Sequence, residues 1–200
     1  MAHKPGLRTQ EPPSDLHKRD LPIIELTGTF RRIHPTTKNA LFFGKTGRNR
    51  FDDPTGKNFG TLYLARDHFG AFIESFGDSE GNTISYGSLN QKSIAEVIAS
   101  KVIRAVDLTA HGAAWLGAAG EVTASDHALS QQWADALWAH PDKPEAIYYR
   151  ARHDQYRFCT AIFNRVPSSS ISVVSTVPLL DPAIRNRLGA MLNHYKFSLV

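Results

Sequence analysis

Apolar residues along the chain follow two periods, one typical of strands and one typical of helices. Residues 23–33 are rich in β-branched and aromatic side chains, which predicts a strand that ends near His34 and Pro35. The short apolar run 61–65 predicts a buried strand, and the alternation over residues 102–108 predicts a strand with one face inward. Further strands are predicted over residues 146–150, 158–163 and 171–177.

Helical spacing predicts the remaining elements. The first helix has Asp67 as its N-cap and ends at Gly77. Its apolar positions are Phe69, Phe72, Ile73 and Phe76. Other helices are predicted over residues 93–100, from a cap at Ser125 to about His140, and over residues 181–194. Helices and strands alternate without strict βαβ order, so the expected fold class is α+β, with mixed or antiparallel sheets and flanking helices.

The N-terminal segment differs from the rest of the chain. Residues 1–22 are rich in proline and charge and contain few apolar side chains, which is typical of a flexible or loosely docked arm. The remaining residues, 23–200, are enough for one domain in a chain of 200 residues with 42% hydrophobic content.

Composition limits the classes of function. No apolar run approaches the ~20 residues of a membrane span, and residues 1–22 lack the pattern of a secretory signal, so a cytoplasmic protein without membrane contact is expected. The net charge is +4, from 23 basic and 19 acidic residues. The arginines occur in short turns beside aromatic residues rather than along one helix, so a phosphate-bearing small molecule fits at least as well as nucleic acid, and direct binding of nucleic acid is not expected.

Several common kinds of site are not predicted. Cys159 is the single cysteine, so it has no intramolecular disulfide partner, and its alternating neighbours predict a buried structural thiol. The nine histidines are scattered, and no metal site is predicted. The glycine-rich phosphate loops, the nucleophile elbow and the zinc-protease motif do not occur.

An ordered set of short motifs carries a more specific signal. The motifs are FRRIH at 30–34, GRNRFDDP at 47–54, GTLYLA at 60–65, AFIE at 71–74, IYYRARHD at 147–154 and FCTAIF at 158–163. Together, over about residues 26–165, they resemble the RES domain family, bacterial toxins that consume NAD and are often encoded beside a helix-turn-helix antitoxin. The resemblance implies a fold like that of the ADP-ribosyltransferase toxins.

The resemblance also implies roles for individual residues. Arg32 and Arg50 would hold the pyrophosphate of NAD, because a planar guanidinium binds phosphate oxygens through paired hydrogen bonds. For their neighbours Arg31 and Arg48, a solvated position is the first expectation and a phosphate contact is the alternative. Tyr63 would position the nicotinamide end. Glu74 would be the acidic member of the family signature.

The implied chemistry is cleavage of the nicotinamide–ribose bond, with Glu74 stabilising the positive charge that grows on the ribose. The acceptor stays open between inorganic phosphate as co-substrate, water and a protein side chain, the last being protein ADP-ribosylation. No cofactor is implied beyond NAD as the substrate. The implied partner is an Xre-type antitoxin with a helix-turn-helix domain, in a complex of higher order.

One position departs from the family pattern. The serine that gives the family name its last letter corresponds to Ala151, so a hydrogen bond worth about 1–3 kcal/mol in a desolvated site is lost unless Ser130, Ser88 or water replaces it. A catalytically weakened or silent RES-like protein that binds a nucleotide or a partner is therefore the alternative to an enzyme.

Ordinary structural roles are the alternatives for single residues. Arg32 and Arg50 could form surface salt bridges, Tyr63 could be a core tyrosine, and Glu74 lies at the edge of the apolar stripe of its helix. The pair of His153 and Asp154 is expected to form a solvated turn, with a catalytic pair as the alternative.

Overall fold

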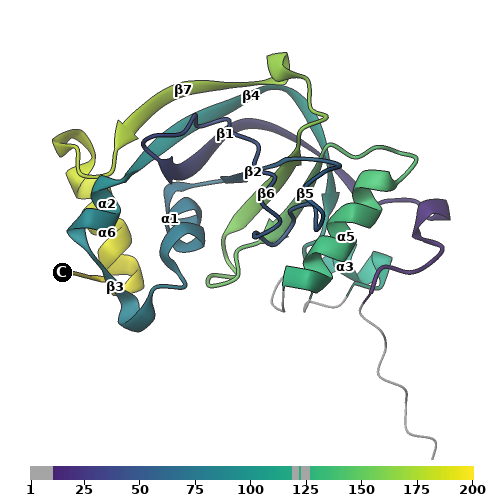
Figure 1. The fold of residues 1–200 in the computed structure, drawn as a ribbon, viewed down its shortest axis with the longest axis horizontal. Helices are drawn as coiled ribbons and strands as arrows, with labels where there is room; N and C mark the ends of the chain where they lie inside the picture. The colour runs from purple at the N-terminus through teal and green to yellow at the C-terminus, as the bar shows by residue number, and fades with distance from the viewer. Residues whose placement is uncertain (1–10, 119–121, 123–126) are drawn as a thin grey trace, which may run out of the picture.

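The fold is built around one six-stranded mixed sheet (Figure 1). The computed structural model describes residues 11–118, 122 and 127–200. The strand order is β1-β2-β6-β5-β4-β7. The strands are β1 (Ile23–Pro35), β2 (Thr61–Ala65), β4 (Lys92–Asp107), β5 (Ala146–Arg150), β6 (Phe158–Phe163) and β7 (Ile171–Pro178). Only β4 and β5 pair in parallel within this sheet as described, and helices flank it, which confirms the expected α+β class.

The pairing of β1 gives the sheet its shape. β1 pairs with β4 along most of its length, so β1, β2, β6, β5 and β4 form a closed circuit and β7 lies outside it on β4. Among the described residues, β1 and β2 pair at one position, where Arg31 lies opposite Ala65. The circuit is therefore weakly joined between these two strands, and they separate on either side of that pair.

The prediction of a helix over residues 93–100 is wrong. These residues form the first half of β4, which pairs with β1 on one side and with β7 on the other. Ile94, Val97 and Ile98 have the i, i+3, i+4 spacing of a helix, but they are also β-branched. Two flanking strands satisfy the backbone of this segment, so tertiary pairing decides its conformation.

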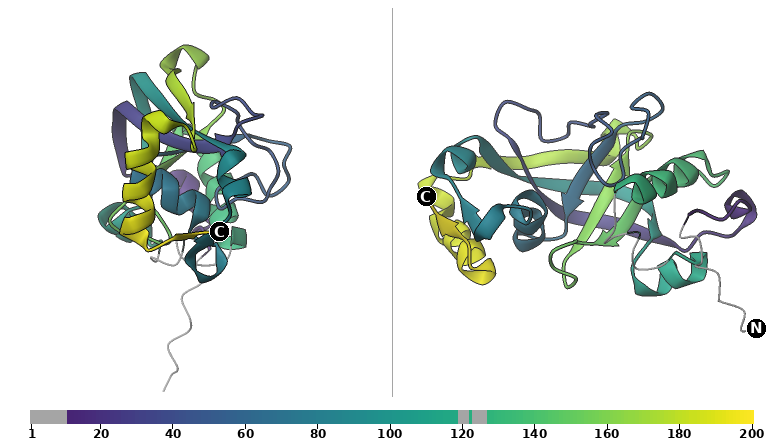
Figure 2. Two further views of the ribbon diagram at one scale, coloured as in Figure 1. Left: turned by 90° about the vertical axis from the view of Figure 1, so that its left-hand side faces the viewer. Right: turned by 60° about the horizontal axis from the view of Figure 1, so that its bottom comes forward.

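Helices α2 (Tyr86–Asn90) and α6 (Arg185–Tyr195) lie at one end of the sheet, and α3 (Ala110–Leu116) and α5 (His127–Ala139) lie at the other (Figures 1 and 2). The smaller elements are η1 (Leu16–Lys18), η2 (Glu80–Asn82), η3 (Ser168–Ser170), η4 (Pro182–Ile184) and the parallel pair β3 (Thr83–Ile84) and β8 (Ser198–Leu199). In the part of the chain that the structure describes, no helix combines the length and apolar character needed to cross a bilayer.

The helix α1 (His68–Phe76) confirms its prediction in detail. The Asp67 side chain accepts a hydrogen bond from the backbone N–H of Gly70 at 2.7 Å, and Gly77 is the C-cap. The last helix is also confirmed, since Asp181 caps η4 and α6 follows it. The predicted helix before His140 is α5, whereas its proposed cap, Ser125, lies outside the described residues.

Two apolar clusters pack on the two faces of the sheet. One lies between the sheet and the helices and includes Phe72, Trp133 and Tyr149. The other includes Phe30 and Leu62 from β1 and β2 and lies on the inner face of the closed circuit. Alternate residues of β1 and β2 therefore face different environments.

Part of the N-terminal segment is docked rather than flexible. Leu16 is 3% exposed and Leu21 is also buried, and both belong to the cluster beneath the helices. His140 Nε2, just after α5, lies 3.1 Å from the carbonyl oxygen of Leu16 and 3.2 Å from that of Arg19. Of the flexible or loosely docked arm expected over residues 1–22, the described part is therefore docked at Leu16 and Leu21, and residues 1–10 lie outside the described residues.

This docking predicts a loss of stability when Leu16 is truncated. Leu16→Ala should lower the free energy of unfolding by about 2–4 kcal/mol, because it removes buried methyl groups and leaves a cavity. Lys18→Ala, which changes an exposed residue of the same turn, should change it by less than about 0.5 kcal/mol. Urea unfolding of both variants measures this, and equal stabilities would show that the segment is not docked in solution.

Candidate functional site

A cleft with a volume of about 290 Å³ opens where β1 and β2 separate. Consecutive residues of both strands line it, Arg31 to Ile33 on one side and Tyr63 to Ala65 on the other, so it lies between the two strands. The other lining residues are Asn49, Arg50, Ala71, Glu74, Ser75, Asp78, His127, Tyr149, Arg152, His153 and Cys159. The cleft thus brings together Arg31, Arg32, Arg50, Tyr63 and Glu74 from the predicted set.

The loop that carries Arg50 folds around the buried carboxylate of Asp52. Asp52 Oδ2 accepts hydrogen bonds from the Thr46 hydroxyl, the Arg48 backbone N–H, and the backbone and side-chain amides of Asn49. These bonds lie between 3.0 and 3.2 Å. A buried carboxylate needs such donors, so the loop conformation is fixed and Arg50, only 7% exposed, is held at the cleft.

Tyr63 closes this loop onto β2. Its hydroxyl donates to Asp52 Oδ1 at 2.9 Å and accepts from the backbone N–H of Phe51 at 2.9 Å. Burial, together with the Asp52 carboxylate, raises the pKa of Tyr63 well above its usual value. The single proton of this hydroxyl is used within the protein, so a ligand would meet the ring of Tyr63 rather than a free hydroxyl.

Asp53 and helix α5 hold the rest of the loop. Burial alone would raise the pKa of Asp53, but hydrogen bonds from Thr55, Asn58 and Phe59 outweigh it and lower that pKa. From α5, Gln131 Nε2 donates to the carbonyl oxygens of Gly47 and Asn49, at 2.9 and 3.0 Å. His127 Nδ1 lies 2.9 Å from the Arg48 carbonyl oxygen.

Arg48, for which a solvated position and a phosphate contact were both open, is exposed and is not among the residues that line the cleft. Its backbone N–H donates to Asp52 within the loop, and its carbonyl oxygen lies against His127 of α5.

Arg31 and Arg32 border the cleft from opposite faces of β1. Arg31 lies opposite Ala65 and therefore on the face of Tyr63, where its Nη2 lies 2.9 Å from Glu96 Oε2. Its Nε donates to His68 Nε2 at 3.1 Å.

Arg32 is bound differently from its neighbour. Its Nη1 donates to the carbonyl oxygens of Ala40 and Phe42, at 2.7 and 3.1 Å. Burial lowers the pKa of Arg32 to about 10, and no described carboxylate forms an ion pair with it. The cleft therefore contains a half-buried cation whose described hydrogen-bond acceptors are neutral carbonyl oxygens.

Glu74 projects from α1 and is held by two donors. The Tyr149 hydroxyl donates to Oε2 at 3.1 Å, and the backbone N–H of Arg152 donates to Oε1 at 3.0 Å. The side chain is otherwise exposed and lines the cleft. It is an oriented carboxylate with unused lone pairs.

Ala151 lies next to this carboxylate but does not line the cleft. It is fully buried, and its backbone N–H donates to the Arg157 carbonyl oxygen at 2.9 Å. The serines considered as substitutes do not line the cleft either: the buried Ser130 hydroxyl donates to the carbonyl oxygen of Val122, and Ser88 lies in α2. The serine that does line it is Ser75.

The sequence did not identify several residues of the cleft. Tyr149 and Arg152 belong to one of the sequence motifs, but the sequence assigned them no role. Their role becomes visible only in the structure, where both donate hydrogen bonds to Glu74 of α1. His153 was paired with Asp154 by sequence proximity, whereas its Nε2 lies 3.1 Å from Asp78 Oδ1. A contact between residues 75 positions apart cannot be predicted from local sequence patterns.

Cys159 is buried, as predicted, although it borders the cleft. Burial raises the pKa of its thiol well above the usual value, and nearby carboxylates add to the effect. The thiol therefore stays protonated near neutral pH and is a poor nucleophile.

Comparison with known proteins identifies the family. The sequence matches the family model of the RES domain over residues 29–181. The chain belongs to the RES domain family. A relative described as probable toxin y4kH, from Sinorhizobium fredii (strain NBRC 101917 / NGR234), is 30% identical over 118 residues, which cover 58% of this chain and 90% of the relative.

A solved structure supports the fold of this RES domain. The crystal structure of the M. tuberculosis MbcT-MbcA toxin-antitoxin complex contains a chain that superposes with a TM-score of 0.67 and 18% identity. The match covers 84% of this chain and 92% of that chain. At this identity the likeness establishes the shared fold, and the residues of the cleft have to be interpreted from their own geometry.

Because the Tyr63 hydroxyl forms two hydrogen bonds inside the protein, removing it should lower the stability of the fold. Tyr63→Phe leaves the Phe51 N–H and the Asp52 carboxylate each without one partner, and should lower the free energy of unfolding by about 1–3 kcal/mol. Tyr156→Phe, at a position that is 88% exposed, should leave it unchanged. Chemical denaturation of both variants measures this difference. A Tyr63→Phe variant as stable as the wild type would contradict the two hydrogen bonds of the Tyr63 hydroxyl.

His68 predicts a pH dependence of stability. Burial, with the positive charges of Arg187 and Arg31, lowers its pKa from 6.5 to about 4. Below pH 6.5 the unfolded chain binds a proton that the folded chain binds only near pH 4, so this residue lowers the free energy of unfolding as the pH falls through that window. His68→Gln should reduce the slope between these pH values in denaturation curves, and identical slopes would contradict this assignment.

Proposed function

We propose that this RES domain protein is a toxin enzyme that consumes NAD by cleaving its nicotinamide–ribose bond. The observation that carries the proposal is the cleft itself, which places several arginines and an oriented carboxylate, Glu74, around one cavity. A dinucleotide has both the anionic and the glycosidic parts that such an arrangement can recognise.

The arginines form the anion-binding part of the proposal. Arg32 is half-buried and forms no ion pair with a described carboxylate, so an incoming phosphate would supply the missing counter-charge. Arg50 lies in the same cleft on a loop fixed by Asp52. We assign the pyrophosphate to these two residues, with Arg31 as a further contact, because guanidinium groups suit phosphate oxygens.

Glu74 is the proposed catalytic residue at the ribose. As the C1′–N bond breaks, the electron pair leaves with nicotinamide, which departs as a neutral base, and positive charge develops on the ribose. A fixed carboxylate stabilises that charge without reorganising during the reaction. The ring of Tyr63 borders the cleft and would contact the nicotinamide end.

Three acceptors fit this chemistry. Inorganic phosphate as co-substrate would give phosphorolysis, water would give hydrolysis, and a protein side chain would give ADP-ribosylation. No cofactor is needed beyond NAD as the substrate.

The position of Ala151 favours an enzyme over the silent binding protein. The carboxylate of Glu74 receives its two hydrogen bonds from Tyr149 and from a backbone N–H, and neither depends on a hydroxyl at residue 151. The missing serine therefore leaves the orientation of the proposed catalytic group intact.

The comparisons support the biological part of the proposal. One relative is named a probable toxin and the similar solved structure is a toxin-antitoxin complex. We propose that an Xre-type antitoxin with a helix-turn-helix domain restrains this protein in the cytoplasm, where NAD is available, by covering the cleft within a complex of higher order.

The decisive test is NAD loss catalysed by the purified protein, followed with and without inorganic phosphate. Glu74→Gln should lower kcat by about 100-fold or more, as expected for removing one group that stabilises transition-state charge. Glu80→Gln, an exposed neighbour in η2 outside the cleft, should retain wild-type activity. Phosphate dependence would indicate phosphorolysis, and label transferred to protein would indicate ADP-ribosylation.

The contradicting result is a wild-type protein that leaves NAD intact even at high enzyme concentration. If Ala151→Ser then gained activity, the missing serine would be the reason and the silent binding protein would be the better description. If Ala151→Ser stayed inactive as well, NAD cleavage would be excluded as the function of this cleft.

A further inference from the structure

The carboxylate of Glu74 is oriented by residues from outside its own helix. Glu74 lies on α1, whereas Tyr149 is on β5 and Arg152 follows the end of that strand. Each donor engages a different oxygen, so the pair fixes both the position and the rotation of the carboxylate plane. The orientation thus depends on how β5 and its following turn sit against α1.

Tyr149 is well placed to provide one half of this support. It is 1% exposed, and its ring packs edge-on against Phe51, with centroids 4.9 Å apart and planes at 62°. Burial raises the pKa of Tyr149 well above its usual value, and the nearby Glu74 adds to the effect, so the hydroxyl keeps its proton. Its ring is fixed by packing and its hydroxyl donates at the cleft.

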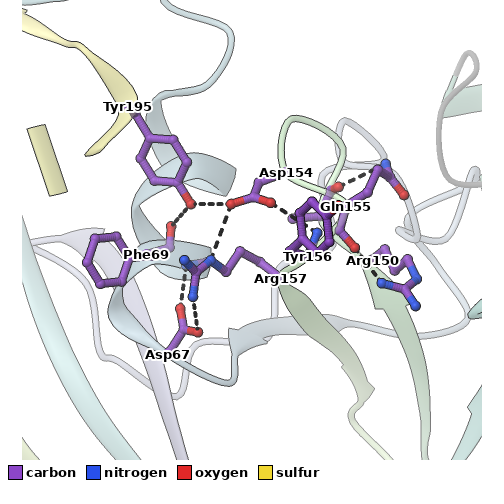
Figure 3. A network of polar contacts seen from close by, with 10 residues as sticks. Asp67, Phe69, Arg150, Asp154, Gln155, Tyr156, Arg157 and Tyr195 are labelled. Carbon is purple, nitrogen blue, oxygen red and sulfur yellow. Dashed lines mark hydrogen bonds and ion pairs between the residues drawn. The ribbon is translucent and has the colours of Figure 1, made fainter. Parts of the chain in front are cut away.

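A polar network fixes the turn that provides the other half (Figure 3). Arg157 Nη1 lies 3.0 Å from Asp67, the N-cap of α1, and its Nε lies 3.2 Å from Asp154 in the turn. Tyr195 from α6 donates to the same Asp154 carboxylate at 2.8 Å. The helix that carries Glu74 and the turn that presents the Arg152 N–H are therefore joined through Arg157.

We propose that Tyr149 is a positioning residue for Glu74 in the cleavage reaction. The proposal rests on the proposed function of the cleft. Without the hydroxyl, the carboxylate keeps the Arg152 N–H on one oxygen and rotates about that contact, so it spends less time facing the ribose. Binding of NAD is unaffected, because the arginines that hold the pyrophosphate lie elsewhere in the cleft.

Phe51 connects Tyr149 to the loop that carries Arg50. It follows Arg50 in the loop, and its ring is the one that packs against Tyr149. Tyr149→Phe preserves this ring contact and removes only the hydroxyl, so it separates the orientation of Glu74 from the placement of Arg50.

The test compares Tyr149→Phe with Tyr148→Phe, a matched control one residue away. Tyr148 packs on the opposite face of the strand, stacked on Phe158, and does not line the cleft. We expect Tyr149→Phe to lower kcat about tenfold, equal to about 1.4 kcal/mol, with KM and the Kd for NAD changed less than about twofold. The control should keep the wild-type kcat, KM and Kd.

A double-mutant cycle distinguishes positioning from general destabilisation. If Tyr149 acts through Glu74, then Glu74→Gln and Glu74→Gln/Tyr149→Phe should have the same residual kcat, because the group that Tyr149 orients is already gone. Full additivity of the two losses, or an unchanged kcat in Tyr149→Phe, would overturn the proposal.

A second measurement is independent of turnover and separates this proposal from the proposed function. The ¹³C resonance of the Glu74 carboxyl, assigned with Glu74→Gln, should shift in Tyr149→Phe and stay in place in Tyr148→Phe. If the wild type does not cleave NAD but the resonance shifts, the proposed function fails while the contact stands. An unmoved resonance means that Tyr149 does not orient Glu74 in solution, whatever the activity.

Discussion

A carboxylate without exposed surface is stable only where donors surround it, and Asp52 draws its donors from the loop that precedes it and from Tyr63. This requirement folds the loop, and the folded loop holds Arg50 at the cleft. The position of the cation is therefore set before any ligand binds. Preorganised charges of this kind stabilise a bound anion without a further cost of ordering the loop.

The two carboxylates of the site differ in how completely they are satisfied. Asp52 is enclosed and uses its oxygens inside the protein, whereas Glu74 receives one donor on each oxygen and remains open to the cleft. A carboxylate offers about four acceptor positions, so Glu74 keeps capacity for a ligand. Burial thus separates the carboxylate that builds the site from the one that is available for chemistry.

Local patterns predicted the elements whose ends are defined within the element. α1 has a capping aspartate, Asp67, and an ending glycine, Gly77, and both were readable in the sequence. The segment 93–100 was misread because its apolar spacing fits a helix and only its pairing with β1 and β7 shows that it is a strand. The sequence left residues 1–22 open between a flexible and a loosely docked arm for a related reason, since the burial of Leu16 depends on contacts with residues far along the chain.

The site shows the same division between local and distant information. The motifs identified Arg50, Tyr63 and Glu74 as residues of one cleft, but the support of Glu74 by Tyr149 depends on how β5 packs against α1. This support also changes the meaning of the departure at Ala151. One of the two donors to Glu74 is a backbone N–H, which every residue except proline supplies, so substitution of a neighbouring side chain cannot remove it directly. What such a substitution can change is the packing that keeps the turn in place, and Ala151 is fully buried in that packing.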